Sequence, residues 1–594
     1  QTTKMKEFIK MTLAVMCGLF IMGIIGFFLF FSMIGAVASL GSSAPVMPRD
    51  GVLLMDMSKV ALAEQTTEAD PMQVIQGNAT QTIGLWDAVK AIKSAESDPA
   101  IKYIFLKSDG LMAGLAQTEE LRQALAEFRK SGKAVISYIE NPTTGSYYLA
   151  SVADKVYMGN YKGGNNMMTG VGTQLIFLKD LLDKLGVNVQ LIRHGKYKSA
   201  GEMFVKNKAS DENLEQNTEM VQSIWKNLAE KICESREITM EQLDKTIDNL
   251  ELNTPEDFLS HSLVDELLTK EELKSQLTNL AVKESFGNVN FISLPDYITV
   301  LSTVKPSSKD KIAIIFAEGE IVDGYEKQQV AGDRFASIIA NVRADSTVKA
   351  VVLRVASPGG SVLASEKIKT EIDLLRKDKP VIASYGDYAA SGGYWISNSC
   401  DKIFSDPSTL TGSIGVFSMI PEFGTTTKKL FHVNVTTVGS HKHSDMYSLM
   451  RPFDARENAY MQESVDNIYE AFIQNVSEGR DMPAEKVDEI AQGRVWTGSD
   501  AIKIGLVDEI GTLYDAVRYA AASAGNPETE SWNIDTYPSP QTTLEMVMEM
   551  FSTTTEDVVL AGTPFESIGK VYKDWSRHAN AEIFARMPYV MTIR

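Results

Sequence analysis

Short runs of apolar residues alternate along this chain with longer stretches in which apolar positions recur at helical spacing. Apolar runs occupy residues 51–57, 101–106, 311–317 and 348–353, and a shorter run lies at 380–383. Continuous apolar runs are typical of strands buried on both faces, and the longer stretches are typical of amphipathic helices. The alternation predicts an α/β fold in which helices cover sheets of parallel strands.

The same pattern occurs twice. The run at 101–106 matches the run at 348–353, and the helical stretches that follow end at Arg129 and Arg376, again 247 residues apart. Acidic helix-rich segments at 211–249 and 454–491 also correspond; we interpret both as packing helices. Such self-similarity indicates a tandem duplication. The predicted segments are an anchor at 1–42, a first repeat at 43–290, a connector at 291–310, a second repeat at 311–535 and a C-terminal extension at 536–594.

The first forty residues depart from this pattern. No charged residue occurs between positions 11 and 40, and this run exceeds the roughly 20 apolar residues that a membrane span requires. Lys4, Lys6 and Lys10 precede it with a single acid, so we expect the N-terminus in the cytoplasm and everything after residue 42 on the other side. The alternative is a cleaved signal peptide, because residues 36–38 resemble a cleavage site. No later segment qualifies as a span, which disfavours a channel or transporter.

The two copies differ at positions that could carry chemistry. Ser391 in Ala390-Ser391-Gly392-Gly393 corresponds to Thr144, so the first copy lacks this serine. Lys198 corresponds to Ser444, so the second copy lacks this lysine. Random drift could produce such differences. Complementary loss is also what a single surviving site, shared between the copies, would leave behind.

A serine and a lysine together suggest a nucleophile and its base. A serine hydroxyl needs an adjacent base, and a neutral lysine amine can serve where no histidine does. The pKa of Lys198 must then lie well below its ordinary value of about 10.4, which burial and nearby positive charge would favour. Arg193 and Lys196 are close enough in sequence to contribute. Lys196 is the competing base, but it corresponds to Lys442 and so shows no division between the copies.

Two glycines after the strand at 348–353 are candidate oxyanion donors. Acyl transfer places negative charge on a carbonyl oxygen, and the backbone N–H groups of Gly359 and Gly360 could stabilise it without side chains in the way. The alternatives are a tight turn before the helix at 362–377, or a phosphate nest. The segment lacks the Lys-Ser/Thr of a P-loop, which weakens the phosphate interpretation.

Composition excludes several other classes. The formal net charge of −19 argues against a nucleic-acid partner, which would need clustered Lys and Arg. Three cysteines do not form a disulfide framework, and the six histidines contain no HExxH motif. We interpret His441 and His443 as surface residues, expect no metal site and predict no cofactor.

Five segments of the chain resemble the signal peptide peptidase A family, in its long, duplicated, membrane-anchored bacterial form. They are Ala356-Ser357-Pro358-Gly359-Gly360-Ser361, Ala390-Ser391-Gly392-Gly393-Tyr394-Trp395, Thr411-Gly412-Ser413-Ile414-Gly415-Val416, Tyr197-Lys198-Ser199-Ala200 and Gly493-Arg494-Val495-Trp496-Thr497-Gly498. The resemblance extends from residue 1 to about residue 535.

The resemblance implies tandem domains similar to Clp protease and crotonase, and a serine endopeptidase. Ser391 would be the nucleophile, Lys198 the general base, and Gly359 and Gly360 the oxyanion hole. Ser413 would orient the lysine amine; otherwise it is a helix N-cap or a turn serine. The family further implies a homo-oligomer, commonly a tetramer, on the outer side of the bacterial inner membrane. Its substrates are signal peptide remnants and other small or misfolded exported proteins.

Two other functions fit parts of the sequence. A crotonase-like acyl-CoA enzyme would also use paired backbone donors, but coenzyme A is cytosolic and the domains are expected outside the cytoplasm. A non-catalytic scaffold for envelope proteins would leave Ser391 unreactive toward a serine-directed acylating probe.

Overall fold

The chain is described from a computed structural model, which covers residues 45–67, 80–303, 308–540 and 583–587, together with a few helical residues between positions 12 and 26. Apart from those few, the predicted membrane anchor lies outside the described residues. Among the residues described, no helix has both the length and the apolar character that crossing a membrane demands.

The first repeat is built on a sheet of six parallel strands, sandwiched between helices. In order across the sheet, the strands are β8 (Glu266–Leu268), β6 (Lys155–Gly159), β5 (Val135–Ile139), β4 (Ile101–Lys107), β1 (Gly51–Asp56) and β9 (Asn290–Ser293). One face is covered by α3 (Leu85–Ser97), α4 (Leu115–Lys130), α5 (Thr144–Ala150), α8 (Asp211–Arg236), α9 (Met240–Asp248), α10 (Pro255–Ser260) and α12 (Leu294–Ser302). The other face is covered by α11 (Lys270–Leu280).

The second repeat has the same arrangement. Its parallel strands, in the corresponding order, are β20 (Glu509–Ile510), β16 (Lys402–Ser405), β15 (Val381–Ala390), β13 (Val348–Ser357), β10 (Lys311–Glu318) and β21 (Asn533–Tyr537). One face is covered by α13 (Gly332–Ala344), α14 (Val362–Arg376), α15 (Gly392–Ser397), α17 (Ala455–Arg480), α18 (Ala484–Ile490) and α19 (Gly498–Ala501), and the other by α20 (Leu513–Ser523). The predicted α/β fold with a tandem duplication is confirmed.

The segments between the predicted domains belong to these sheets. Residues 291–303, in the predicted connector, hold the end of β9 and helix α12, which packs on the first repeat. Strand β21 crosses the predicted boundary at residue 535 and closes the edge of the second sheet beside β10. The domain boundaries themselves stay a prediction.

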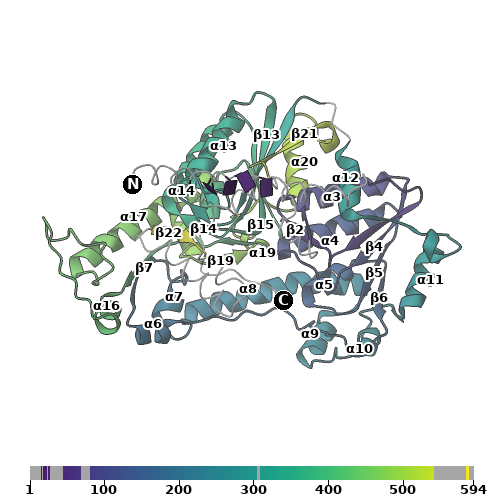
Figure 1. The fold of residues 1–594 in the computed structure, drawn as a ribbon, viewed down its shortest axis with the longest axis horizontal. Helices are drawn as coiled ribbons and strands as arrows, with labels where there is room; N and C mark the ends of the chain where they lie inside the picture. Colours follow the sequence, from purple (N-terminus) through teal and green to yellow (C-terminus); the bar gives the residue numbers. More distant parts are fainter. Residues whose placement is uncertain are drawn as a thin grey trace.

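A third sheet joins the repeats. Its order is β12 (Val330–Ala331), β11 (Ile321–Val322), β14 (Gly359–Ser361), β22 (Ile583–Arg586), β18 (Val416–Glu422) and β7 (Asn188–His194). Strand β7 of the first repeat runs antiparallel to β18 of the second. Figure 1 shows β22 next to β14 and β7 below them, with α17 on one side and α8 passing below. The short helices beyond this sheet are α6 (Lys179–Leu185), α7 (Glu202–Val205) and α16 (Gly424–Leu430).

Smaller elements complete the description. Strands β2 (Val60–Ala63) and β3 (Gln81–Gly84) form a parallel pair in the first repeat. In the second repeat, β17 (Leu410–Gly412) pairs with the end of β15, and β19 (Val495–Thr497) pairs with β17. The single-turn 3-10 helices are η1 (Phe286–Asn288) and η2 (Thr529–Ser531).

A buried ion cluster also holds the repeats together. Arg354, on β13 of the second repeat, is fully buried and contacts two carboxylates of the first repeat. Its Nε lies 2.7 Å from Glu64 Oε2, and its Nη2 lies 2.7 Å from Glu120 Oε1. At the same interface, the backbone N–H of Ala116 donates to Asp387 on β15 over 2.7 Å. The strand that leads to Ser391 is therefore fixed against a helix of the first repeat.

Candidate active site

Ser391 stands at a sharp turn between a buried strand and a helix. Strand β15 ends at Ala390 and helix α15 begins at Gly392, so Ser391 alone makes the turn. Its φ and ψ are 57° and −112°, a left-handed conformation that costs a non-glycine residue on the order of 1–3 kcal/mol. Its N–H donates to the carbonyl of Gly412 over 2.8 Å, which holds the turn in place. A nucleophilic serine is commonly presented on such a turn.

The glycine pair after Ser391 allows this turn to pack closely. A Cβ on Gly393 would stand 2.6 Å from the carbonyl oxygen of Ser357, on the neighbouring strand. Any side chain at this position would therefore push the start of α15 away from the sheet. The first copy has Ser146 there, in an ordinary helix that begins at Thr144 and is capped by Thr143.

Lys198 comes from the other repeat and reaches the serine. It lies in the loop between β7 and α7 and is fully buried. Its Nζ is 2.8 Å from Ser391 Oγ, 2.9 Å from the carbonyl oxygen of Ser413 and 3.0 Å from Ser413 Oγ. The three residues predicted to act together are thus in direct contact within one chain.

Glycines of the second repeat enclose the lysine stem. A Cβ on Gly493 would stand 2.6 Å from the Cβ of Lys198, and a Cβ on Gly415 would stand 3.2 Å from its Cδ. Gly493 has a φ of +77°, so glycine is favoured there for its backbone conformation as well. The backbone of the second repeat can therefore close directly over Lys198 and exclude water.

Burial lowers the pKa of Lys198 well below its ordinary value of 10.5. Positive neighbours are not the cause. Arg193 donates from Nη1 to the backbone carbonyl of Lys198 over 2.8 Å and forms an ion pair with Glu202, so its charge is already balanced. The Lys196 ammonium lies over the ring of Tyr197, 4.9 Å from its centroid. Neither the Arg193 guanidinium nor the Lys196 amine therefore competes with Lys198 as the partner of Ser391.

Ser413 is held where it can orient the amine. It follows β17 with a φ of +50°, and its N–H donates to the carbonyl of Arg494 over 2.7 Å. The nearest following helix, α16, begins at Gly424, so Ser413 is not a helix N-cap. Its two oxygens are both within 3.0 Å of the lysine Nζ. They fix the direction of the amine relative to Ser391.

Gly359 and Gly360, the two predicted oxyanion donors, face different parts of the structure. Gly359, with a φ of +98°, lies at the corner beside the serine turn, because a Cβ on it would stand 2.6 Å from the backbone nitrogen of Gly392. Its own N–H donates to Ser357 Oγ over 3.2 Å. Gly360 faces away along β14, where a Cβ would stand 1.9 Å from the carbonyl oxygen of Ile321.

Sequence reasoning did not identify Gly392 as part of this corner. It is the residue after the nucleophile, and its N–H lies at the start of α15. In a strand-to-helix serine turn, the N–H after the nucleophile commonly stabilises the oxyanion. Its place directly after Ser391 was the feature of the sequence that could have identified it.

The counterparts of Ser391 and Lys198, each in the opposite repeat, do not form a second site of this kind. Thr144 donates from Oγ1 to the carbonyl of Gly170 over 2.9 Å and is buried. Ser444, the counterpart of Lys198, is exposed and donates to the carbonyl of His441 over 3.0 Å. Each copy thus contributes one half of a single arrangement.

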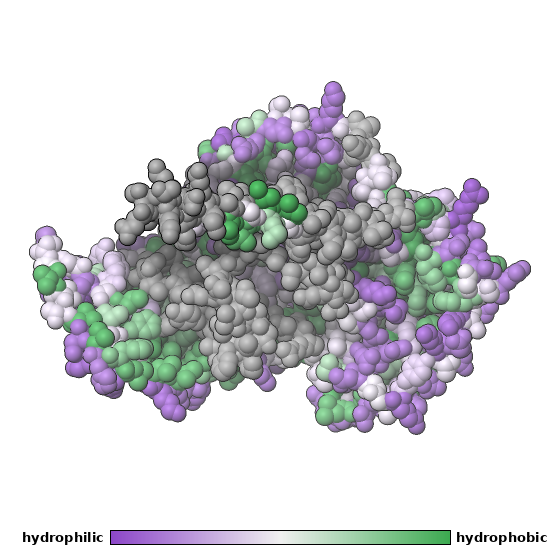
Figure 2. All heavy atoms as spheres, in the orientation of Figure 1, coloured by the Kyte–Doolittle hydropathy of each residue, from purple (hydrophilic) through white to green (hydrophobic). Residues whose placement is uncertain are grey.

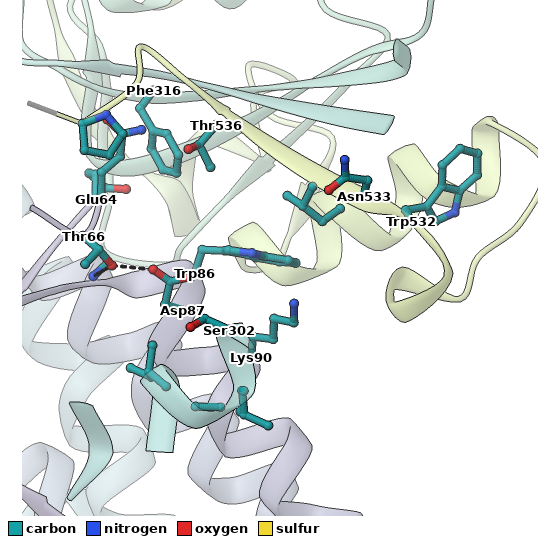
Figure 3. A pocket seen from close by; sticks show the side chains of 17 residues that line it. Glu64, Thr66, Trp86, Asp87, Lys90, Ser302, Phe316, Trp532, Asn533 and Thr536 are labelled. Carbon is teal, nitrogen blue, oxygen red and sulfur yellow. Dashed lines mark hydrogen bonds between the residues drawn. The ribbon is translucent and has the colours of Figure 1, made fainter. Parts of the chain in front are cut away.

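Other polar clusters in the described part of the chain are separate from this site. His443, Asp454 and Glu457 lie close together, but Arg451 makes a direct ion pair with Glu457 and lowers the pKa of that carboxyl to about 2. A cavity of about 310 Å³ lies at the junction of the repeats (Figure 3). It is lined by Glu64, Trp86, Asp87, Lys90, Phe316 and Trp532 among others, and by none of the predicted site residues.

The fold and the site define a serine hydrolase: an α/β protein with a serine on a strained turn, in contact with a buried amine. Comparison with known proteins gives the class. The profile of Peptidase family S49 matches residues 127–283 and 373–526, one match in each repeat. Protease 4 of Haemophilus influenzae is 36% identical over 518 residues, which cover 84% of this chain and 83% of that protein.

A plant protein is also similar. The chloroplastic serine protease SPPA of Arabidopsis thaliana is 31% identical over 470 residues, covering 76% of this chain and 68% of that protein. A solved structure of a ClpP1 N165D mutant from Listeria monocytogenes aligns with 34% of this chain and 93% of its own, at 14% identity and a TM-score of 0.23. That score is too low to relate the two folds in detail. This chain belongs to peptidase family S49 and is a serine protease.

Proposed function

We propose that this chain is a membrane-anchored serine endopeptidase whose nucleophile is Ser391 and whose general base is Lys198. The observation that carries the proposal is the 2.8 Å contact between Lys198 Nζ and Ser391 Oγ in a fully buried site. Burial favours the neutral amine, and a neutral amine can accept the proton of the serine hydroxyl.

The reaction proceeds by acyl transfer. The Ser391 hydroxyl donates to the neutral Lys198 amine, loses its proton to it and attacks the peptide carbonyl carbon, which becomes tetrahedral. The developing oxyanion turns toward the corner formed by Gly359 and Gly392. The lysine ammonium then gives its proton to the leaving nitrogen as the C–N bond breaks. Water attacks the resulting ester, passes a proton through the same amine and releases the acid and Ser391.

Single substitutions at the dyad test this assignment. Ser391→Ala and Lys198→Ala should each lower peptide cleavage by about 10²-fold or more, since nucleophile and base are each required. Lys196→Ala is the matched control, because it removes a neighbouring lysine that does not contact the serine, and it should cleave at the wild-type rate. Full activity of either dyad variant, with an unchanged circular dichroism spectrum, would refute the assignment.

The proposed substrates are cleaved signal peptides and other apolar peptides left in the membrane. The motifs shared with signal peptide peptidase A support this class, and so does the apolar cluster on β18 and β7, the strands on either side of the site loops, in which Phe417 and Met419 pack with Leu191. A synthetic signal peptide should be cleaved at least tenfold faster than a polar peptide of equal length. Equal rates would contradict the substrate assignment but not the assignment of Ser391 as nucleophile and Lys198 as base.

The proposed location is the bacterial inner membrane, with the catalytic repeats on the extracytoplasmic side. The uncharged run at 11–40 and the preceding lysines support it. Membranes washed in alkaline carbonate should retain the full chain, and Lys substitutions at Leu19 and Ile25 should release it. Release of the unsubstituted chain would exclude an anchor.

Assembly into a homo-oligomer, a tetramer by resemblance, is part of the proposal. Exposed apolar side chains support it: Leu181 and Leu185 of α6, Leu430 of α16, and Phe431 directly after α16 are all exposed. Helices α6 and α16 lie at the same end of the molecule (Figure 1). Figure 2 shows a green surface over this end. Monomers rarely leave large apolar patches uncovered. Phe431→Glu should reduce the mass measured by sedimentation. An unchanged mass would show that this patch is not part of the oligomer interface.

A further inference from the structure

A single glutamine of the first repeat contacts both neighbours of Lys198. Gln216 lies in the second turn of α8 and is only 1% exposed. Its Nε2 donates to the backbone carbonyl of Tyr197 and to Ser199 Oγ, over 3.1 Å in each case. Tyr197 and Ser199 are the residues directly before and after the lysine. One amide group therefore holds both ends of the short segment that carries the amine.

The oxygen of the same amide contacts the second repeat. The N–H of Val495, the first residue of β19, donates to Gln216 Oε1 over 3.2 Å. The two residues before Val495 are part of the site. Gly493 lies against the lysine stem, and the carbonyl of Arg494 accepts the N–H of Ser413 over 2.7 Å. Gln216 thus bridges the segment that carries the base in one repeat and the segment that covers it in the other.

The bridge leaves little freedom to either segment. Both polar atoms of the Gln216 side chain are hydrogen-bonded, and the carboxamide that joins them is planar. Because the side chain is buried, water cannot replace a partner that moves away, and a buried amide without its partner is unfavourable. A shift of either segment is therefore opposed by this one side chain.

The second copy lacks this glutamine as well as the lysine. Helices α8 and α17 are both 26 residues long and both end at a left-handed C-cap residue, so their positions correspond one to one. Gln216, the sixth residue of α8, corresponds to Tyr460, the sixth residue of α17, which is 49% exposed. The difference between the copies that singles out Lys198 thus also singles out Gln216.

The charged groups on the α8 side of the lysine are paired with one another. Arg193 of β7 contacts Glu202 of α7, with Nη1 3.1 Å from Oε1. Arg494 Nη1 lies 3.5 Å from Glu215 Oε1, and its Nη2 contacts Glu219, the two acids being on α8. Among the residues described, the lysine amine itself is hydrogen-bonded only to the two site serines.

The charged groups on the other side are also accounted for. His194 of β7 lies 2.7 Å from Asp466 of α17, and the Lys196 ammonium lies over the ring of Tyr197. The charges around Lys198 are therefore met by local partners. Exclusion of water is what favours the neutral amine, and it depends on how closely the two segments stay together.

We propose that Gln216 is a positioning residue of the protease, which holds the segment of Lys198 against residues 493–495 so that water is excluded and the amine is directed at Ser391. This inference deepens the proposed function and rests on it. Gln216 touches no reacting atom and acts through the lysine. Without the bridge the two segments separate, water reaches the amine, and the amine stays charged up to a higher pH.

Gln216→Met tests the bridge, because methionine has a similar length and volume and makes none of the three hydrogen bonds. The rate at which a serine-directed acylating probe labels Ser391 in the full chain is measured from pH 5 to pH 10. The midpoint of the profile should move up by about one pH unit or more, so that the rate on its rising part falls about tenfold. Gln222→Met is the matched control, because Gln222 is exposed on the same helix, and it should change neither value. A slower rate with an unmoved midpoint would overturn the proposal.

Ser199→Ala is a milder second variant, which decides the question if Gln216→Met does not fold. It removes one oxygen atom and one of the three hydrogen bonds. The midpoint should move in the same direction by about 0.3 pH unit or more, and combining the two substitutions should add nothing to the shift of Gln216→Met. An unmoved midpoint in Ser199→Ala would overturn the proposal.

Two further arms separate this inference from the proposed function. Hydrogen exchange of residues 195–200, followed by mass spectrometry, needs no catalysis and should become about fivefold faster or more in Gln216→Met but not in Gln222→Met. Unchanged exchange would overturn the bridge whatever the activity. Labelling that Lys198→Ala does not slow would instead count against the proposed function, and the exchange result would still show whether Gln216 holds the segment.

Discussion

At the scale of single residues, the proposed chemistry depends on keeping water away from the Lys198 amine. Lys198 is charged by default, and water around its Nζ would restore that charge. Gly493 and Gly415 provide the enclosure, because their backbones come closer to the lysine stem than any side chain would permit. The proposed catalysis therefore also depends on these two glycines, which bear no reactive group.

Gly493→Ala tests this enclosure. The added methyl would stand 2.6 Å from the Lys198 Cβ, so the loop must move, water can enter and kcat should fall at least tenfold. Gly132→Ala is the matched control: it has a similar φ of +86°, with nothing within 4 Å of the added Cβ. Both variants share the strain of an L-residue at positive φ, roughly 1–2 kcal/mol, which thermal unfolding would measure. Equal kcat in the two variants would contradict the enclosure argument.

Ser391 and Lys198 could be predicted from the sequence, but the glycines that enclose Lys198 could not. Comparison of the two copies singled out Ser391 and Lys198, because each is missing from the opposite repeat. Gly493 appeared only as part of a shared motif. A glycine needed for close approach has no local signature, since the group it would meet is about 300 residues away in the chain.

At the scale of elements, the interface between the repeats contains more acids than bases. Burial raises the pKa of Asp387 to about 6 and those of Glu119 and Glu318 to about 7. Because the folded pKa values lie above the ordinary ones, the folded chain binds more protons than the unfolded chain between about pH 4 and pH 7. Stability from these groups is fully present below that window and is lost as pH rises through it. Arg354 is the buried cation that offsets the cost.

Arg354→Met should therefore be strongly destabilising at neutral pH. It leaves Glu64 and Glu120 buried without their cation, a loss of about 3–5 kcal/mol in the free energy of unfolding. The loss should shrink as pH falls, because burial raises the pKa of Glu120 and its protonation removes an uncompensated charge. Arg376→Met is the control, since its pair with Asp401 is partly exposed and worth about 1 kcal/mol or less. A loss independent of pH in urea titrations would exclude this explanation.

The regular elements could be predicted from periodicity, and the third sheet could not. Buried parallel strands leave continuous apolar runs, so β4, β10 and β13 were evident. Strands β7 and β18 pair across more than 200 residues, and β22 enters from beyond residue 580. No local pattern encodes which distant partner a short strand will find.

At the scale of the whole molecule, the duplication has produced one site from two copies. The sheets of the two repeats keep the same strand order, and α8 and α17 are both 26 residues long. The second copy holds the serine turn and the glycine corner beside it, and the first supplies the amine through β7 and the loop after it. Pairing of β7 with β18 is what carries Lys198 across to Ser391. Neither repeat contains the contact by itself.

The most direct measurement is the rate at which a serine-directed acylating probe labels the full chain between pH 5 and pH 9. Labelling should occur at Ser391, rise with pH as the Lys198 amine loses its proton, and reach a plateau below the ordinary lysine pKa of 10.5. It should fall by about 100-fold or more in Lys198→Ala and stay unchanged in Lys196→Ala. Labelling of Lys198→Ala at the wild-type rate, or a rate that declines as pH rises, would contradict the account.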